Sequence, residues 1–365
     1  MTKYKFDEIA INSTQKKKPT EEDKVYYIGL EHIDPGCFDV VRWGSNVAPT
    51  GDKLLMQKGD VLFGKRRAYQ RKVAIAPFDG IFSAHGMVLR PNLKVIDANY
   101  FPFFISSDKF METAVRISVG GLSPTINWKD LARQEFELPS LDEQKVLADK
   151  LWAAYRLKEA YKKLLVATDE MVKSQFIEMF QDSPLVRLGD HIETQSGGTP
   201  NTKKGEYYDG GTIPWLSSGE VNLGYISSTE KYITEEGLEN SAAKWVPKNS
   251  VVIAMYGATA GKVGFITIPL TTNQAVCALL PNDAFNPLYL YYAVSSKKDW
   301  MIAQCRGAAQ PNISQGIIRS MKIPMPSLSE QIQFVNVIKQ ADKSKFELKQ
   351  SIEHIDKVIK SLING

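Results

Sequence analysis

Cysteine and histidine are scarce in this 365-residue chain. The three cysteines, Cys37, Cys277 and Cys305, are odd in number and far apart, which argues against a disulfide framework and a cysteine-rich zinc site. None of the four histidines lies at metal-ligand spacing from another histidine or a cysteine, so the sequence predicts no bound metal. The expected compartment is therefore the cytoplasm, where thiols stay reduced.

Long hydrophobic runs are also lacking. No apolar stretch approaches the roughly 20 residues that a membrane-spanning helix needs, and residues 1–14 lack the apolar segment of a secretory signal. We therefore expect no membrane contact. Hydrophobic residues make up 43% and charged residues 24% of the chain, which excludes a disordered or collagen-like protein. The formal net charge of +4 is compatible with nucleic-acid binding but too mild to prove it.

Motifs of enzyme chemistry are missing as well. Residues 257–262 superficially resemble a phosphate loop, but three residues separate the glycines instead of four, and Val263 stands where Ser or Thr should bind magnesium. Residues 286–289 are similar to the Asn-Pro-Pro-Tyr site of adenine methyltransferases, but the second proline is absent, and a helix start explains them better. No nucleophile elbow is present. The sequence thus predicts no catalytic residues and no cofactor bound by this chain.

What the sequence does contain is a long internal repeat. Residues 138–144 (LPSLDEQ) match residues 325–331 (MPSLSEQ) at an offset of 187. Further upstream, and in the same order in both halves, residues 120–127 match 307–314, residues 59–75 resemble 249–265, and residues 99–107 resemble 288–296. Such a repeat predicts two similar modules of about 180 residues each.

Each module ends in a charged segment, rich in leucine and isoleucine, that is typical of a long helix. Both segments begin Pro-Ser-x-x-Glu, which is a capping box. Beyond the caps, apolar residues alternate at spacings of four and three, the repeat of a coiled-coil seam. The spacer residues that we expect on this seam are Leu151, Lys158, Leu165, Ile338, Lys345, Leu348, Ile352, Ile355 and Ile359.

Two lysines interrupt the apolar seam, one in each helix and at the same seam position. Lys158 and Lys345 lie 187 residues apart, at equivalent positions of the two helices. A polar residue on a seam costs stability but can fix the register of the helices. Alternatively, both lysines extend their ammonium groups to the edge of the interface.

The remaining regions are predicted to be α+β, with a substantial sheet in each. Glycine, asparagine, aspartate and proline punctuate β-rich runs at residues 24–28, 60–63, 251–254 and 274–280, while the aromatic stretches 99–106 and 287–294 indicate short buried helices. The predicted division is a globular domain over residues 1–138, a helix over 139–183 that ends before Pro184, a second globular domain over 184–325, and a helix over 326–365.

The clearest binding signal follows the run at residues 60–63. Five cations lie within residues 65–72, beside an aromatic ring and an amide, and the candidates are Lys65, Arg66, Arg67, Tyr69, Gln70, Arg71 and Lys72. Such a cluster can neutralise phosphates, while Arg and Gln can read base edges in the major groove. The alternative is a solvated charged turn. The equivalent stretch of the second module offers Tyr256, Thr259 and Lys262 in a glycine-rich setting, so two such loops would read different sequences.

Two further surfaces carry small polar groups suited to phosphates and base edges. One comprises Thr199, Asn201, Lys203 and Lys204 followed by Ser217 and Ser218, and its alternative is ordinary loop polarity. The other recurs before each long helix, with Ser123 and Thr125 in the first module and Gln310 and Asn312 in the second. This second pair is either a ligand-facing loop or a structural turn.

The whole pattern resembles the specificity subunits of type I restriction–modification systems, over essentially the entire chain. The Pro-Ser-Leu-x-Glu-Gln helix starts at residues 139–144 and 326–331, together with Tyr-Gly-Ala-Thr-x-Gly-Lys-Val at residues 256–263, carry the resemblance most specifically. Residues 64–73 share only the end of that last motif. The resemblance implies two target recognition domains, each reading half of a split DNA target, and two helices that pair as an antiparallel coiled coil and set the gap.

The resemblance also implies partners. These are double-stranded DNA, two methyltransferase subunits that carry S-adenosylmethionine, and, in a restriction enzyme, added motor-nuclease subunits; the chain itself would be non-catalytic. A stand-alone DNA-modifying enzyme is disfavoured by the missing motifs. A two-module coiled-coil scaffold that binds proteins or glycans is the other alternative, and salt dependence distinguishes it, because binding through phosphates weakens steeply as salt rises.

Overall fold

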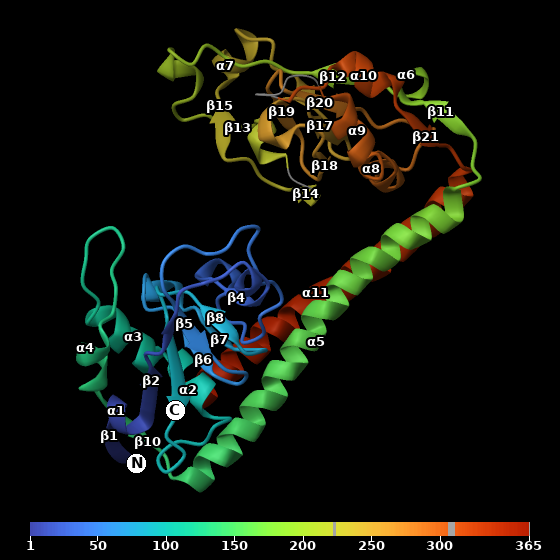
Figure 1. The fold of residues 1–365 in the computed structure, drawn as a ribbon. Helices are drawn as coiled ribbons and strands as arrows, with labels where there is room; N and C mark the ends of the chain where they lie inside the picture. The colour runs from blue at the N-terminus through green and yellow to red at the C-terminus, as the bar shows by residue number, and fades with distance from the viewer. Residues whose placement is uncertain (222–223, 306–310, 365) are drawn as a thin grey trace. The chain divides into compact units, whose positions relative to one another are not determined.

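The computed structural model describes residues 1–221, 224–305 and 311–364 (Figure 1). The chain forms two compact units: unit 1 comprises Met1–Lys163 and Leu348–Gly365, and unit 2 comprises Leu164–Glu347. Each unit therefore combines one globular module with a segment of each of two long helices, α5 (Leu141–Phe180) and α11 (Leu328–Asn364).

The module of unit 1 is α+β. Its elements are β1 (Thr2–Lys5), α1 (Phe6–Ile9), β2 (Ala10–Ser13), β3 (Lys16–Lys17), η1 (Glu22–Tyr26), β4 (Tyr27–Ile28), η2 (Leu30–His32), β5 (Lys53–Met56), β6 (Val61–Phe63), η3 (Ala68–Gln70), β7 (Val73–Ile75), β8 (Gly80–Phe82), β9 (Met87–Pro91), α2 (Phe101–Ser106), α3 (Asp108–Arg116), α4 (Trp128–Ala132) and β10 (Glu135–Leu138).

These strands form sheets in the orders β2-β9-β6-β7 and β3-β5-β8-β4, with a separate β1-β10 pair. Neighbouring strands are antiparallel, except that β4 runs parallel to β8. Alternate side chains of β6 enter different cores, because successive residues of a strand point to opposite faces. Val61 and Phe63 join the core that includes α2, α3 and the helix residue Leu151, whereas Leu62 joins the core between the two four-stranded sheets.

The module of unit 2 has the same kind of architecture. Its elements are β11 (Leu185–Arg187), α6 (Leu188–His191), β12 (Thr194–Ser196), η4 (Gly205–Tyr207), β13 (Ile213–Leu216), η5 (Ser218–Glu220), β14 (Gly224–Ile226), β15 (Lys231–Ile233), α7 (Glu235–Glu239), β16 (Trp245–Val246), β17 (Val251–Ala254), η6 (Gly257–Thr259), β18 (Val263–Ile266), β19 (Leu270–Thr272), β20 (Val276–Leu279), α8 (Pro287–Ser295), α9 (Lys298–Gln304), α10 (Gln315–Ser320) and β21 (Lys322–Pro324).

The sheets of unit 2 repeat those of unit 1. The order β12-β20-β17-β18 corresponds to β2-β9-β6-β7, with β14 added at one edge, and β11-β21 corresponds to β1-β10. The second sheet has the order β15-β13-β19-β16. As in β6, the residues of β17 alternate between two cores: Val251 and Ile253 face one, and Val252 and Ala254 face the other. The internal repeat predicted from the sequence is therefore a structural repeat.

Most of the predicted short elements are confirmed. The runs at 60–63, 251–254 and 274–280 contain β6, β17 and β20, and the two aromatic stretches form the buried helices α2 and α8. The prediction of a strand over residues 24–28 is wrong for its first three residues, which belong to the 3-10 helix η1. The Asp23 carboxylate accepts hydrogen bonds from the amide and hydroxyl of Thr20, and this local turn competes with an extended chain.

Both long helices begin at the predicted capping boxes. The amide of Ser140 donates to Glu143 at 2.9 Å, and the amide of Ser327 donates to Glu330 at the same distance. Bonds from the Ser140 hydroxyl and amide hold the pKa of Glu143 below its ordinary value, and Ser327 does the same for Glu330. The first helix ends at Phe180, shortly before Pro184, as predicted.

The residue after each capping glutamate is a buried glutamine. Gln144 is 0% exposed and spans from helix to module. Its Oε1 accepts from the amide of Asp97 at 2.8 Å, and its Nε2 donates to the carbonyls of Val95 at 3.1 Å and Pro139 at 2.9 Å. The first turn of α5 is thereby attached to the chain segment that leads into α2.

The second glutamine repeats these bonds in unit 2. Gln331, also 0% exposed, accepts from the amide of Asn286 at 2.7 Å and donates to the carbonyls of Ala284 at 3.3 Å and Pro326 at 3.0 Å. The glutamine of the repeated Pro-Ser-Leu-x-Glu-Gln motif therefore attaches each long helix to its own module through hydrogen bonds.

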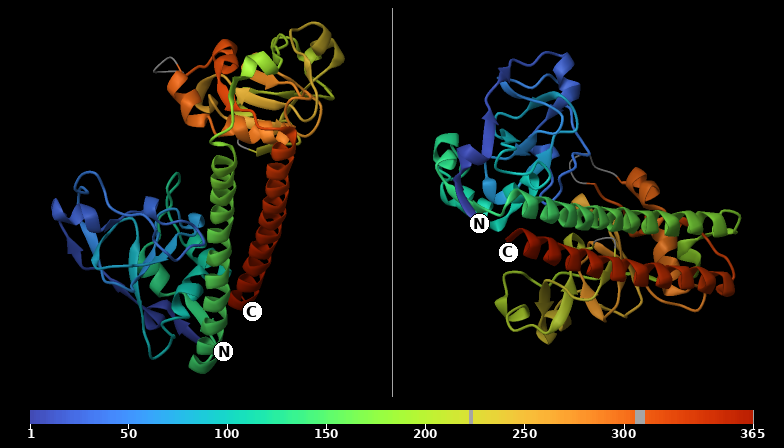
Figure 2. Two further views of the ribbon diagram at one scale, coloured as in Figure 1. Left: turned by 90° about the vertical axis from the view of Figure 1, so that its right-hand side faces the viewer. Right: turned by 90° about the horizontal axis from the view of Figure 1, so that it is seen from below.

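The two long helices lie side by side within each unit (Figure 2). In unit 1, Leu151 and Tyr155 of α5 share a core with Ile359 and Leu362 of α11. In unit 2, Phe176 of α5 packs on Phe334 of α11, with ring centroids 5.4 Å apart.

We predict that Gln331→Leu lowers the free energy of unfolding by about 2–4 kcal/mol, because it leaves three buried backbone groups without a partner. Gln333→Leu is the matched control on the same helix, since Gln333 is exposed, and it should change stability by less than about 0.5 kcal/mol. Urea unfolding of the full chain measures both. Equal stability of the two variants would show that the hydrogen bonds of Gln331 are dispensable.

Candidate nucleic-acid interface

Each module brings a hairpin loop and a companion loop together at one end of its sheets. Hairpin loop 1 (residues 64–72) connects β6 to β7, and hairpin loop 2 (residues 255–262) connects β17 to β18. Companion loop 1 (residues 120–126) and companion loop 2 (residues 311–314) precede α4 and α10. Most of the residues predicted to contact a ligand lie on these four loops.

Backbone hydrogen bonds tie the loops together in the same way in both modules. In unit 1, the amide of Ile126 donates to the carbonyl of Lys65 at 3.0 Å, and the amide of Arg67 donates to the carbonyl of Pro124 at 2.7 Å. The side chains of hairpin loop 1 and companion loop 1 are therefore presented on one framework.

Unit 2 repeats this ladder with other side chains. The amide of Ile313 donates to the carbonyl of Met255 at 2.9 Å, and the amide of Gly257 donates to the carbonyl of Pro311 at 3.0 Å. Between these bonds, Tyr256 and Asn312 pair as an isolated antiparallel β-bridge, as Arg66 and Thr125 do in unit 1. The companion loops are thus structural partners of the hairpin loops and at the same time neighbours of any ligand there. Gln310, also predicted at this site, lies outside the described residues.

Two of the five cations of hairpin loop 1 bind the module itself. The Arg71 guanidinium donates to the Asp108 carboxylate at 2.7 Å and to the carbonyl of Ser106 at 3.0 Å. The Lys72 ammonium donates to the carbonyl of Leu30 at 2.7 Å. These contacts anchor the loop. Because Arg71 and Lys72 are already bonded within the module, they are less available to a ligand than the sequence predicted.

The other three cations lack a carboxylate. Among the described residues, Lys65, Arg66 and Arg67 form no ion pair with an acidic side chain. Arg67 donates to the Ser123 hydroxyl from Nε at 3.2 Å and from Nη2 at 3.1 Å, and Arg66 Nη1 lies 3.3 Å from His85 Nε2. Their positive charge is therefore not neutralised within the part of the protein that is described.

Residues far away in the sequence add to this charge. The pKa of His85 is lowered by burial and then by the charges of Arg66, Lys65 and Lys53. The pKa of Lys65 is lowered by burial and then by the charge of Lys16. We name Lys16, Lys53, Lys65, Arg66, Arg67 and His85 the basic cluster. Sequence reasoning missed Lys16, Lys53 and His85, although the lysine run at residues 16–18 was a visible signal.

The remaining predicted residues of the first module lie beside the basic cluster. Tyr69 and Gln70 are in the 3-10 turn η3, and the Tyr69 ring is 55% exposed. The side chains of Ser123 and Thr125 are half-buried, and Ser123 is already bonded to Arg67.

The second module joins two surfaces that the sequence analysis treated separately. The Thr259 hydroxyl of hairpin loop 2 donates to the carbonyl of Ser218 at 2.8 Å. The Thr199 hydroxyl donates to Gln274 Oε1 at 2.6 Å, in the turn between β19 and β20. Gln274 is an exposed amide that sequence reasoning missed, because only the fold brings it beside Thr199.

Some predicted residues of this surface have local partners. The Ser217 hydroxyl donates to Glu220 at 2.9 Å and helps to close a short turn. The Lys204 ammonium lies 3.2 Å from Glu206, whose carboxylate offsets its positive charge, and 3.0 Å from the Tyr207 hydroxyl. This end of unit 2 is consequently more neutral than the basic cluster.

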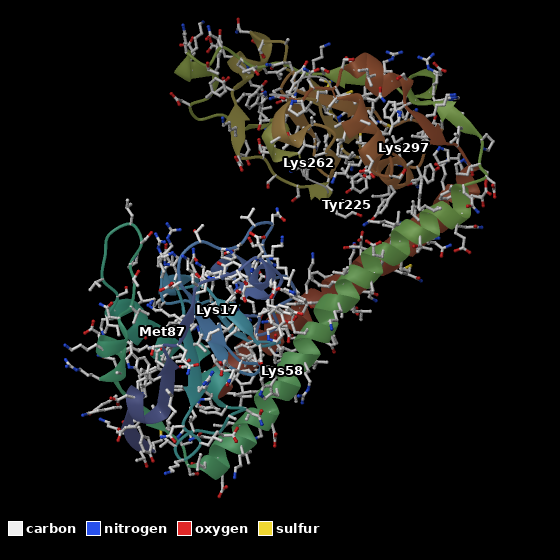
Figure 3. The ribbon with its side chains drawn as sticks, in the orientation of Figure 1. Lys17, Lys58, Met87, Tyr225, Lys262 and Lys297 are labelled. Carbon is white, nitrogen blue, oxygen red and sulfur yellow. The ribbon has the colours of Figure 1, made fainter. Side chains whose placement is uncertain are left out.

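The other predicted residues of unit 2 lie on the surface of the same turns. Asn201 and Lys203 are exposed, and Asn201 Oδ1 accepts from the Lys203 amide at 3.1 Å. Tyr256 is 42% exposed, and Lys262, labelled in Figure 3, is half-buried. Hairpin loop 2 therefore offers a phenol, a hydroxyl and one lysine, where five cations lie in hairpin loop 1.

Two observations concern metal-binding and nucleophilic side chains. Nowhere in residues 1–221, 224–305 or 311–364 do three His, Cys, Asp or Glu side chains gather closely enough to hold a metal ion. Burial raises the pKa of the Cys277 thiol to about 12, so that this thiol stays protonated at neutral pH. Within the same ranges, no helix has the length and hydropathy needed to span a membrane.

Comparison with known proteins agrees with the repeated architecture. A family model for the type I restriction modification DNA specificity domain matches residues 3–165 and again residues 181–356. The chain therefore belongs to this family, and the resemblance noted in the sequence is confirmed.

Individual relatives carry the same description. The EcoR124I/EcoR124II specificity subunit of Escherichia coli is 31% identical over 160 residues, 42% of this chain and 40% of the relative. The matched part thus spans less than half of the length of that relative. A putative MjaX specificity subunit of Methanocaldococcus jannaschii is 23% identical over 376 residues, covering 94% of this chain and 87% of the relative.

A solved structure has the same fold. It comes from work on complex assembly and conformational transition of the type I R-M system, and it matches with a TM-score of 0.65 at 17% identity. The match covers 99% of this chain and 96% of the other.

We predict that Lys65→Gln with Arg66→Gln raises the pKa of His85 toward its ordinary value of 6.5, because two neighbouring positive charges are removed while burial persists. NMR titration of the His85 ring measures this. Lys58→Gln is the control, because Lys58 lies before β6, at the end opposite hairpin loop 1, and should leave the pKa unchanged. An unmoved pKa in the double variant would separate His85 from the basic cluster.

Proposed function

We propose that this chain is the non-catalytic DNA sequence-specificity subunit of a type I restriction–modification complex. Each globular module reads one half of a bipartite DNA target, and the long helices set the gap and recruit methyltransferase subunits. The functional division is residues 1–138 and 184–325 as target recognition domains, with 139–183 and 326–365 as spacer helices.

One observation carries the proposal: the same ladder of hairpin and companion loops presents unlike side chains in the two modules. A shared framework suits one kind of partner, whereas a cationic set in one module and a hydroxyl and amide set in the other suit different base sequences. The two half-sites should therefore be unlike.

The proposed DNA contacts are the loop residues and their neighbours. They are Lys65, Arg66, Arg67, Tyr69, Gln70, Arg71, Lys72, Ser123, Thr125, Thr199, Asn201, Lys203, Lys204, Ser217, Ser218, Tyr256, Thr259, Lys262, Gln310 and Asn312, with Lys16, Lys53, His85 and Gln274 added. Lys65, Arg66 and Arg67 are the strongest of these, because phosphates attract cations that no carboxylate already neutralises.

The helices suit the role of a spacer that pairs as an antiparallel coiled coil. All nine expected seam residues are buried or half-buried, including Leu165, Leu348, Ile352 and Ile355. At 1.5 Å per residue, helices of 40 and 37 residues are about 55–60 Å long. That length can separate two sites on DNA by one to two helical turns of roughly 34–36 Å.

The proposed partners follow from this role. They are double-stranded DNA and two methyltransferase subunits, with motor-nuclease subunits in a restriction complex. This chain binds no cofactor of its own, and S-adenosylmethionine belongs to the methyltransferase. Because the proposed target is DNA, the expected compartment is the cytoplasm.

Methylation mapping tests the proposal directly. The chain is co-expressed with methyltransferase subunits from the same source, and host DNA is sequenced for methyladenine. The expected result is a split motif with two unlike halves and a fixed gap. Replacing residues 184–325 with another module should change one half only. A stable complex without new methylation, combined with salt-insensitive ligand binding, would favour the protein- or glycan-binding scaffold.

We predict that Lys65→Ala, Arg66→Ala and Arg67→Ala together weaken DNA binding by about 10–100-fold at moderate salt, because three phosphate contacts are lost. Each lost contact should also lower the slope of log K against log salt concentration by almost one. Assembly with the methyltransferase should be unchanged. Lys58→Ala, Lys94→Ala and Lys129→Ala form the matched control, since these lysines are exposed and outside the basic cluster. Equal DNA affinities would remove the basic cluster from the interface.

A further inference from the structure

The lysine on the seam of α5 forms an ion pair with the other helix. In unit 1, Lys158 Nζ lies 2.6 Å from Asp356 Oδ1 of α11. The lysine side chain is only 11% exposed, while the aspartate side chain is 50% exposed. The ammonium group thus depends on Asp356 for charge compensation far more than the carboxylate depends on Lys158.

The equivalent lysine of α11 makes the reciprocal contact. In unit 2, Lys345 Nζ lies 3.0 Å from Asp169 Oδ1 of α5 and 3.0 Å from Asp342 Oδ1 of its own helix. Its side chain is 21% exposed. Burial disfavours the charged form, but the bonds to Asp342 and Asp169 outweigh burial and raise the pKa of Lys345, so the ammonium stays charged at neutral pH.

Both ion pairs fit one and the same register of α5 against α11. Lys158 and Lys345 are 187 residues apart, and so are Asp169 and Asp356. From the first pair to the second, the position moves 11 residues forward on α5 and 11 residues backward on α11, as a single antiparallel alignment requires. Both helices therefore carry one lysine and one aspartate in the same order.

Other alignments of the same helices remove the cross-helix carboxylate of each lysine, so that Lys158 has no carboxylate and Lys345 keeps only Asp342 of its own helix. A slip of one heptad in one direction would set Lys158 opposite Lys349 and Lys345 opposite Lys162. A slip in the other direction would set them opposite Ile363 and Phe176. A parallel arrangement with equivalent residues opposite each other would bring the two lysines together. Like charges, or the buried Lys158 ammonium without a partner, penalise each alternative.

Each helix is also bonded to its own module one turn before the lysine. Tyr155 OH accepts from the amide of Phe38 at 2.9 Å. Asp342, at the equivalent position, accepts from the hydroxyl of Tyr225, which is labelled in Figure 3, at 2.6 Å. A change in helix register would therefore displace a position that is fixed to a module.

We propose that the pairs Lys158–Asp356 and Lys345–Asp169 fix the register of the two spacer helices and so determine the gap between the half-sites. This inference rests on the proposed function for its DNA consequence, although the register itself can be measured without DNA. The pairs contribute specificity more than stability, because half-exposed ion pairs are weak while a misplaced buried charge is costly.

Carbodiimide coupling tests the register in the full chain, because it joins a lysine to a carboxylate in direct contact. Mass spectrometry should find amide links between Lys158 and Asp356 and between Lys345 and Asp169. In the variant K158M/K345M, links between other lysines and carboxylates of α5 and α11 should spread to additional registers. Absence of both wild-type links would overturn the proposal.

The same variant separates a register role from a packing role. Methionine fills a similar volume, so K158M/K345M should melt at the same temperature as the wild type or higher. Its discrimination against gaps about three base pairs too long or too short should fall about tenfold, since one heptad is about 10.5 Å of helix. The control K163M/K357M changes two exposed lysines of the same helices and should retain full discrimination.

Two results contradict the proposal or isolate it from the proposed function. If K158M/K345M keeps the wild-type pattern of links between the other lysines and carboxylates of α5 and α11, and keeps gap discrimination, the lysines only extend to the edge of the interface, and the proposal is wrong. If the wild type binds no DNA at any gap but cross-links at both pairs, and in K158M/K345M the links between other lysines and carboxylates of the two helices spread to additional registers, the register assignment holds while the proposed function fails.

Discussion

The attachment of each long helix to its own module is the constraint on which the rest of the structure depends. Gln144 and Gln331 are fully buried, and each satisfies three backbone groups at the point where a strand ends and a helix of about ten or eleven turns begins. Because the glutamine bonds to backbone atoms, the direction in which the helix leaves the module does not depend on the side chains of the loops. The loops can therefore diverge without altering the helix.

That separation explains how one framework can present two chemistries. The ladder between hairpin and companion loops uses main-chain groups, so it is the same in both modules even though Lys65, Arg66 and Arg67 stand where the second module has Met255, Tyr256 and Gly257. Side chains on such a ladder can differ between the modules without changing the fold.

Much of the architecture was predictable because it depends on local and periodic signals. Capping boxes, seam spacing and the offset of 187 residues lie in the sequence itself, and the helices α5 and α11 and strands β6 and β17 form where those signals indicate. The run at residues 24–28 was misassigned because the Asp23 side chain competes for the local backbone. His85 and Gln274 were missed because only the pairing of distant strands brings them to the loops.

The sequence by itself determined which residues are apolar, charged or turn-forming, and hence the repeat, the helix starts and the approximate position of the basic loop. Only the tertiary structure decided how charges are used. Arg71 and Lys72 turn back to the module, whereas Arg66 and Arg67 do not meet a carboxylate among the described residues. Likewise, spacing located Lys158 on the seam, but only the antiparallel direction of α11 supplied Asp356 as its partner. The physical reason is that electrostatic pairing depends on distance in space, which a one-dimensional pattern does not contain.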